Sequence, residues 1–161
     1  MNSVRIVGGE YRRRVLKFPD SEGLRPTPDR VRETLFNWLG QELDGWHCLD
    51  LFAGSGALGF EAASRGAARV TMVEQSPRVL AALHENHELL HKPSTIEIIR
   101  ADAIKYLAST KAKFDLIFLD LLLPDLGGSH VLKAVKRRDP EAVVVIVTGH
   151  GTIDTAVNAM K

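Results

Sequence analysis

The residues best suited to chemistry form a glycine-rich turn, Gly54-Ser55-Gly56-Ala57-Leu58-Gly59, directly after an apolar stretch. Gly54 and Gly56 can adopt backbone conformations that a Cβ would block, and they let a ligand approach the main chain. Gly59 lets the following helix pack closely on the preceding strand. That helix, expected over residues 57–65, would direct unpaired N–H groups and the positive end of its dipole at the turn. These features predict a site for a nucleotide-type cofactor.

An acidic residue at a characteristic distance supports this prediction. Glu74 ends the next apolar run, twenty positions after Gly54, and a carboxylate there can hydrogen-bond ribose hydroxyls. The alternative is a plain tight turn with a surface glutamate. Asp50 lies in the strand four residues before the first glycine, and the stretch Asp-Leu-Phe-Ala-Gly-Ser-Gly resembles the methyltransferase version of the motif. We therefore predict S-adenosylmethionine in preference to a dinucleotide.

The elements that would position this site alternate as in an α/β protein. An apolar strand beginning at Cys48 leads into the turn, and a short helix contains Tyr106 and Leu107. Asp102 follows a strand end, where its carboxylate could accept a hydrogen bond from an adenine amine. Further strands are expected at 70–74, 94–100, 114–120 and 142–147, and a further helix at 77–90. The predicted fold class is α/β, a Rossmann-like sheet with an N-terminal β-hairpin.

The N-terminal segment is expected to form that hairpin, with strands at 4–7 and 15–18 around an arginine-rich loop. A loop follows, and then a helix with Thr27 as N-cap and Pro28 at its first position. Its apolar face is expected to contain Val31, Leu35, Trp38 and Leu39. We divide the chain into a hairpin and loop, residues 1–26, and a Rossmann-like domain, residues 27–161.

Charge is balanced overall, with 21 Lys and Arg against 20 Asp and Glu, but residues 1–32 contain eight basic and four acidic residues. Such a segment can contact nucleic-acid phosphates without reading sequence, although a merely solvated surface is the alternative. The single cysteine, Cys48, excludes an internal disulfide and is expected in the core. Without an 18-residue apolar run or a signal-peptide pattern, we expect a soluble, cytoplasmic protein. His84, His87 and His91 share a helix face, but no accompanying pattern favours a metal, and we predict none.

Residues 1 to about 120 resemble the bacterial small-subunit (16S) rRNA guanine-N2 methyltransferases. The matching pieces are Arg5 to Gly9, Leu24 to Leu39, Asp50 to Gly59, Glu74 and Asp102. The resemblance implies methyl transfer from S-adenosylmethionine to a guanine N2 amine in rRNA or an assembling small subunit. The predicted cofactor-binding residues are Asp50, Phe52, Ala53, Gly54, Ser55, Gly56, Gly59, Glu74, Asp102 and Ala103. The predicted RNA-binding residues are Arg5, Arg12, Arg13, Arg14, Arg25 and Arg30.

The same resemblance makes Asp120 the catalytic residue, which would bind the target amine. The family's Asp-Pro-Pro-Phe motif is replaced here by Asp120-Leu121-Leu122-Leu123-Pro124. In that motif a proline carbonyl helps to align the amine and the aromatic ring stacks on a flipped base. The departure predicts impaired catalysis with cofactor binding retained.

Residues 114–161 resemble the middle of a response-regulator receiver domain, so the chain looks like a chimera. In that family Asp120 would be the phosphoacceptor and Thr148 the switch hydroxyl. The receiver's paired metal-binding acids and conserved lysine have no clear counterpart. The alternatives to an enzyme are thus a signalling module or a non-catalytic RNA-binding chimera. We also expect a sheet truncated at its C-terminus, with residues 142–147 as an edge strand that invites self-association.

Overall fold

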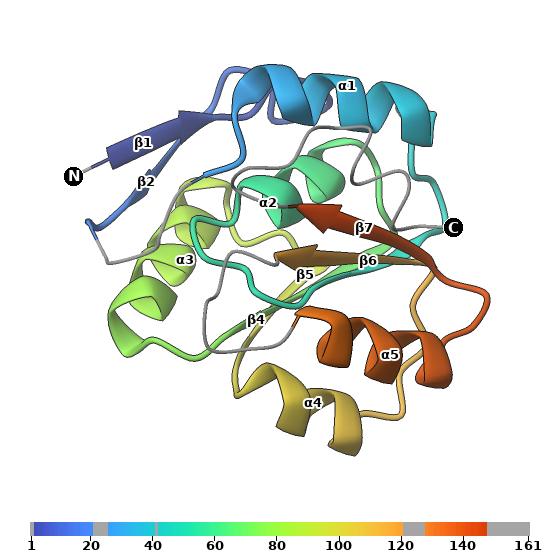
Figure 1. The fold of residues 1–161 in the computed structure, drawn as a ribbon. Helices are drawn as coiled ribbons and strands as arrows, with labels where there is room; N and C mark the ends of the chain where they lie inside the picture. The colour runs from blue at the N-terminus through green and yellow to red at the C-terminus, as the bar shows by residue number, and fades with distance from the viewer. Residues whose placement is uncertain (1, 21–25, 41, 121–127, 148–161) are drawn as a thin grey trace.

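The computed structural model describes residues 2–20, 26–40, 42–120 and 128–147 (Figure 1). Its strands are β1 Asn2–Arg5, β2 Val15–Phe18, β3 His47–Asp50, β4 Arg69–Glu74, β5 Ile96–Arg100, β6 Leu116–Asp120 and β7 Val143–Val147. Its helices are α1 Asp29–Leu39, α2 Ala57–Ser64, α3 Pro77–Leu89, α4 Ala103–Ser109 and α5 Gly128–Arg138.

The main sheet has the strand order β5-β4-β3-β6-β7, and all of its pairings are parallel. Helices α1, α2 and α3 cover one face, whereas α4 and α5 cover the other (Figure 1). The order reverses between β3 and β6, which is where ligands bind in open parallel sheets. The predicted Rossmann-like α/β fold is therefore confirmed, as is the separate antiparallel hairpin.

Alternation along the buried strands divides the core between the two faces of the sheet. In β3, Cys48 belongs to the cluster beneath α1, α2 and α3, and Leu49 belongs to the cluster beneath α4 and α5. In β6, Phe118 and Ile117 divide in the same way. Strands buried on both faces need continuous apolar runs, which is why 114–119 reads as almost unbroken apolar sequence.

The hairpin packs on the rest of the molecule. Strands β1 and β2 pair with Asn2 opposite Phe18 and Arg5 opposite Val15. β1 lies two residues before the expected 4–7, because Ile6 already belongs to the connecting loop, where its N–H donates to Arg14. The buried side chains of the hairpin join the core beneath α1 to α3. The division of the chain at residue 26 stays a prediction.

The start and buried face of α1 differ from the sequence prediction. Pro28 is the N-cap, and no side chain caps the helix, so the expected Thr27 cap is wrong. Trp38 is 52% exposed, whereas Phe36 and Arg32 are buried. Arg32 forms a hydrogen bond with Glu61 of α2, and Phe36 lies one helical turn after Arg32. These two residues therefore define the buried face of α1, and Trp38 points away from the core.

Strand β7 lies at the edge of the sheet among the described residues, where it pairs with β6. Its middle residues 144–146 are buried between the two helical layers. Self-association through this edge stays a prediction. Within the described part of the chain, no helix is long and apolar enough to cross a membrane.

Candidate functional site

The glycine-rich turn adopts the conformation that its composition predicts. Gly54 has φ +54° and Gly56 has φ +83°, both in the left-handed region. A Cβ on Gly56 would lie 2.5 Å from the Phe60 ring and 2.8 Å from Leu83. A Cβ on Gly59 would lie 2.9 Å from the Met72 methyl group in β4, which confirms the expected close packing of α2 on the sheet. Glycine is thus required at the turn and under the helix.

Two carboxylates hold this turn from the carboxyl ends of adjacent strands. Asp50, 3% exposed at the end of β3, accepts a hydrogen bond from the Gly59 N–H at 3.0 Å. Glu74, half-buried at the end of β4, accepts from the Gly54 N–H at 3.0 Å. Its second oxygen accepts from the N–H groups of Gln75 and Ser76 at 3.0 and 2.9 Å. Both side chains are therefore fixed before any ligand arrives.

Asp102 lies beside Glu74, at the end of the next strand. It is the N-cap of α4, and its carboxylate accepts from the Lys105 N–H at 3.0 Å. The Ala101 N–H donates to the backbone carbonyl of Glu74, which joins the two strand ends. Ala103 is buried beneath this edge. Of the three predicted carboxylates, Asp50 and Glu74 thus end β3 and β4, and Asp102 follows the end of the neighbouring strand β5 by two residues.

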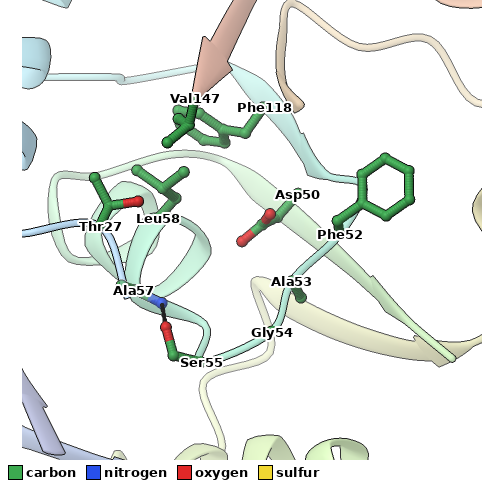
Figure 2. Close-up of a pocket in the computed structure, with 10 residues that line it drawn as sticks. All are labelled: Thr27, Asp50, Phe52, Ala53, Gly54, Ser55, Ala57, Leu58, Phe118 and Val147. Carbon is green, nitrogen blue, oxygen red and sulfur yellow. Dashed lines mark hydrogen bonds between the residues drawn. The ribbon is translucent and has the colours of Figure 1, made fainter. Parts of the chain in front are cut away.

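A pocket opens on the other side of the glycine turn, toward β6 and β7 (Figure 2). Asp50 lies between Leu58 and Thr27 on one side and Phe52 on the other. The ten lining residues are Thr27, Asp50, Phe52, Ala53, Gly54, Ser55, Ala57, Leu58, Phe118 and Val147. Five predicted cofactor residues line this pocket, and Gly56, Gly59, Glu74, Asp102 and Ala103 do not.

Sequence reasoning missed part of this lining. The sequence predicts Thr27 as a helix cap, but its side chain borders the pocket. Phe118 and Val147 come from strands β6 and β7, so only the sheet order brings them to the turn. Their positions at the carboxyl ends of expected strands were the available signal.

Sequence reasoning also missed a buried ion pair between α1 and α2. Arg32 and Glu61 are both 0% exposed, and the Arg32 Nη1 lies 2.8 Å from Glu61 Oε1. Arg65 Nε lies 3.0 Å from the other carboxylate oxygen. Burial lowers the pKa of Arg32, and the nearby charges of Glu61 and Asp29 act in the opposite direction. The available signal was Glu61 itself, the one charged residue in the stretch 57–63.

The predicted RNA-binding arginines are on the surface where the structure describes them. Arg12, Arg13 and Arg14 are exposed on the hairpin loop, and Arg13 has φ +74°. Arg5 is exposed, and its Nη2 lies 3.3 Å from Asp29 Oδ2, so it forms an ion pair at the surface. The remaining predictions are Arg30, exposed at the start of α1, and Arg25, which lies outside the described residues.

The phosphoacceptor hypothesis falls largely outside the described residues. Asp120 ends β6 opposite Val147, but its side chain and Thr148 lie outside the description. Among the described residues, no three His, Cys, Asp or Glu side chains form a group that could hold a metal ion.

Cys48 is fully buried, which confirms its predicted position in the core. Its burial raises the pKa of the thiol to about 12.

Comparison with known proteins places this chain in a family. Residues 4–123 match the family described as "Conserved hypothetical protein 95". The chain is 47% identical over 117 residues to "Ribosomal RNA small subunit methyltransferase D" of Escherichia coli K12, covering 73% of this chain and 59% of that protein. The chain thus spans about three fifths of the length of that relative.

Two further likenesses cover different parts of the chain. The structure of "Putative methyltransferase yhhF from Escherichia coli" matches with a TM-score of 0.81 at 36% identity, covering 94% of this chain and 85% of that one. "Regulatory protein LuxO" of Vibrio cholerae is 57% identical over 47 residues, which are 29% of this chain and 10% of that protein. Both the family match and the fold extend over most of the molecule, and the chain belongs to the family described as conserved hypothetical protein 95.

Proposed function

We propose that this chain binds S-adenosylmethionine at the carboxyl edge of β3, β4 and β5, and that it is built for methyl transfer to a guanine N2 amine in small-subunit rRNA. The observation that carries the proposal is a glycine turn in the left-handed conformation whose Gly54 N–H donates to the Glu74 carboxylate. The names of the related methyltransferases support the reaction class. We place such a protein in the cytoplasm, with its substrate.

The residues present fit this cofactor. Glu74 Oε1 accepts one backbone hydrogen bond and keeps a lone pair for a ribose hydroxyl. Asp102 holds the start of α4 through one oxygen, which leaves the other for an adenine amine. The pocket wall of Phe52 and Ala53 offers apolar surface beside the Asp50 carboxylate. The ribose hydroxyls and the adenine amine of such a ligand would each find an acceptor here.

When bound, S-adenosylmethionine supplies an electrophilic methyl group on a sulfonium. Asp120 ends β6, on the pocket side of the turn, from which its carboxylate would orient the target amine and take up its proton. Gly56 and Ser55 would keep the turn close against the ligand. Because the residues after Asp120 lack the family's prolines and aromatic ring, we propose slow methyl transfer with cofactor binding intact.

The arginines of the hairpin loop would supply affinity for RNA. Arg12, Arg13 and Arg14 are adjacent and exposed, an arrangement suited to successive phosphates. Replacing all three by alanine should weaken RNA binding at every sequence and reduce its dependence on salt concentration. The affinity for S-adenosylmethionine should not change.

Calorimetric titration with S-adenosylmethionine tests the proposal. Glu74→Ala should weaken binding about tenfold, the loss of one hydrogen bond to a charged group. Glu97→Ala is the matched control, because Glu97 is exposed on the neighbouring strand β5 and pairs only with Arg69 among the described residues. Equal affinities in both variants, or no binding by folded wild-type protein, would contradict the cofactor site.

A second candidate function, a receiver-like signalling module, is favoured by the LuxO likeness. We propose that the chain is a chimera in which receiver-like sequence follows the methyltransferase-like part. The test is incubation with beryllium fluoride and Mg²⁺, with Asp120→Asn as control. Binding of beryllium fluoride that requires Asp120 would support phosphoryl chemistry. The absence of binding would contradict the signalling function and leave methyl transfer as the one proposed activity.

A further inference from the structure

A cluster of buried polar side chains lies beneath the hairpin, and the proposed cofactor site does not use it. Its centre is Glu61 on α2, which accepts hydrogen bonds at both carboxylate oxygens from Arg32 and Arg65. The Arg65 guanidinium also lies 4.9 Å from the centre of the Phe36 ring. Burying a carboxylate is costly unless it is paired and hydrogen-bonded, and here two guanidinium groups supply the partners.

Glu61 also holds the backbone of the hairpin loop. The Val7 N–H donates to Oε1 and the Gly8 N–H donates to Oε2, both at 2.9 Å. One turn further along α2, Ser64 continues the contact. Its carbonyl accepts from the Glu10 N–H at 2.7 Å, and its hydroxyl accepts from the Tyr11 N–H at 2.9 Å. The backbone leading to Arg12 is thus fixed on α2.

The same cluster reaches the pocket. Helix α2 begins at the glycine turn, with Gly56 as its N-cap, so Glu61 lies little more than one turn from the site. The Arg32 Nε donates to the carbonyl of Thr27 at 3.0 Å, and Thr27 borders the pocket. Arg32 also donates to the carbonyl of Arg5 at 2.7 Å, at the end of β1.

We propose that Glu61 is a positioning residue that fixes the arginine loop of the hairpin relative to the cofactor pocket. Well-packed apolar residues in place of Glu61, Arg32 and Arg65 together could give equal or better stability, but they could not accept the Val7 and Gly8 hydrogen bonds. The buried charge therefore defines one placement of the loop. The inference rests on the proposed function, because it gives Arg12, Arg13 and Arg14 a set distance from the reacting edge.

The test compares Glu61→Gln with Ser64→Ala in the full chain. Glutamine has nearly the same size, but its NH₂ group would face a donor, either the Gly8 N–H or the Val7 N–H. Ser64→Ala removes the hydroxyl that holds Tyr11 without leaving a buried charge, so it remains informative if the first variant unfolds. Glu97→Gln, in an exposed ion pair, is the control for the loss of a carboxylate.

Two measurements separate positioning from mere stability. Hydrogen exchange should become at least about tenfold faster at residues 7–11 in both variants, since each loses hydrogen bonds there. Affinity for a fluorescein-labelled stem-loop of small-subunit rRNA should fall about tenfold. The affinity for S-adenosylmethionine without RNA should stay within about twofold of wild type, because the glycine turn is untouched.

Unchanged RNA affinity in both variants would overturn the proposal, whether or not the loop exchanges faster. Hydrogen exchange at residues 7–11 of Glu61→Gln that is as slow as in wild type would overturn the proposal as well. Wild-type protein that binds RNA but no cofactor would contradict the proposed function alone, because exchange and RNA affinity still decide the role of Glu61.

Discussion

Glu61 and Glu74 use the same chemistry in opposite surroundings. Each carboxylate accepts backbone N–H groups from a loop that must keep one shape. Glu61 is fully buried and paired with Arg32 and Arg65. Glu74 is half-buried at the carboxyl edge of the sheet, and within the described residues its carboxylate accepts hydrogen bonds from backbone N–H groups.

The difference separates a structural carboxylate from one that we propose binds the cofactor. A buried charge with two arginine partners has no remaining role toward a ligand, and its removal leaves other charges unpaired. A half-exposed carboxylate at the ligand-binding edge keeps solvent and a ligand within reach. The pair therefore predicts opposite consequences for stability and for affinity.

Glu61→Ala should have the largest effect on folding. It leaves the buried Arg32 guanidinium without its 2.8 Å partner, and removing one partner of a buried pair costs about 3–5 kcal/mol. Urea unfolding followed by circular dichroism measures the loss. Glu97→Ala, which breaks an exposed pair, should cost no more than about 1 kcal/mol. Similar losses in the two variants would remove the distinction drawn for Glu61.

Gly56→Ala tests the rigid turn that Glu74 holds. The variant should lose about 1–3 kcal/mol of stability for the left-handed conformation, and more from overlap with Phe60. Gly45→Ala is the matched control, since Gly45 has nearly the same φ, +81°, with no atom within 4 Å of an added Cβ. Thermal unfolding of both variants isolates the cost of overlap. Equal melting temperatures would show that the turn relaxes freely.

Glu74→Ala should reverse the pattern seen for Glu61. Water can reach the Gly54, Gln75 and Ser76 N–H groups once the carboxylate is gone, so the stability loss should be about 1 kcal/mol. The affinity for S-adenosylmethionine should nevertheless fall about tenfold. Differential scanning calorimetry with and without cofactor measures both. A large stability loss without loss of affinity would make Glu74 structural, like Glu61.

Cys48 should give the smallest effect, visible only at alkaline pH. Its folded pKa of about 12 lies above the ordinary value of 9.0, so the folded protein keeps the thiol proton longer than the unfolded chain. This contribution to stability is complete below pH 9 and is lost as pH rises toward 12. Between pH 8 and 10 the resulting loss of folding stability should amount to about 1 kcal/mol. Denaturant titrations of wild type and Cys48→Ala should show a shallower decline in the variant, and parallel curves would contradict the prediction.

Much of the fold could be predicted because local patterns and global architecture agree here. Short apolar runs alternating with helical periodicity give the parallel sheet, and the glycine spacing gives the turn. Helix α1 was less predictable. The sequence pattern placed Trp38 inward, because apolar periodicity carries no information about a salt bridge to a distant helix.

The sequence by itself determined the glycine turn, since the left-handed conformations of Gly54 and Gly56 are local demands that glycine satisfies. It also determined that an acidic residue ends β4, where the strand period places Glu74. Only the tertiary structure decided that Glu61 holds the hairpin and that Thr27 and Val147 meet at the pocket. Those contacts join segments that are far apart in the chain, and neither residue type nor spacing encodes which partner a buried charge or a strand end will find.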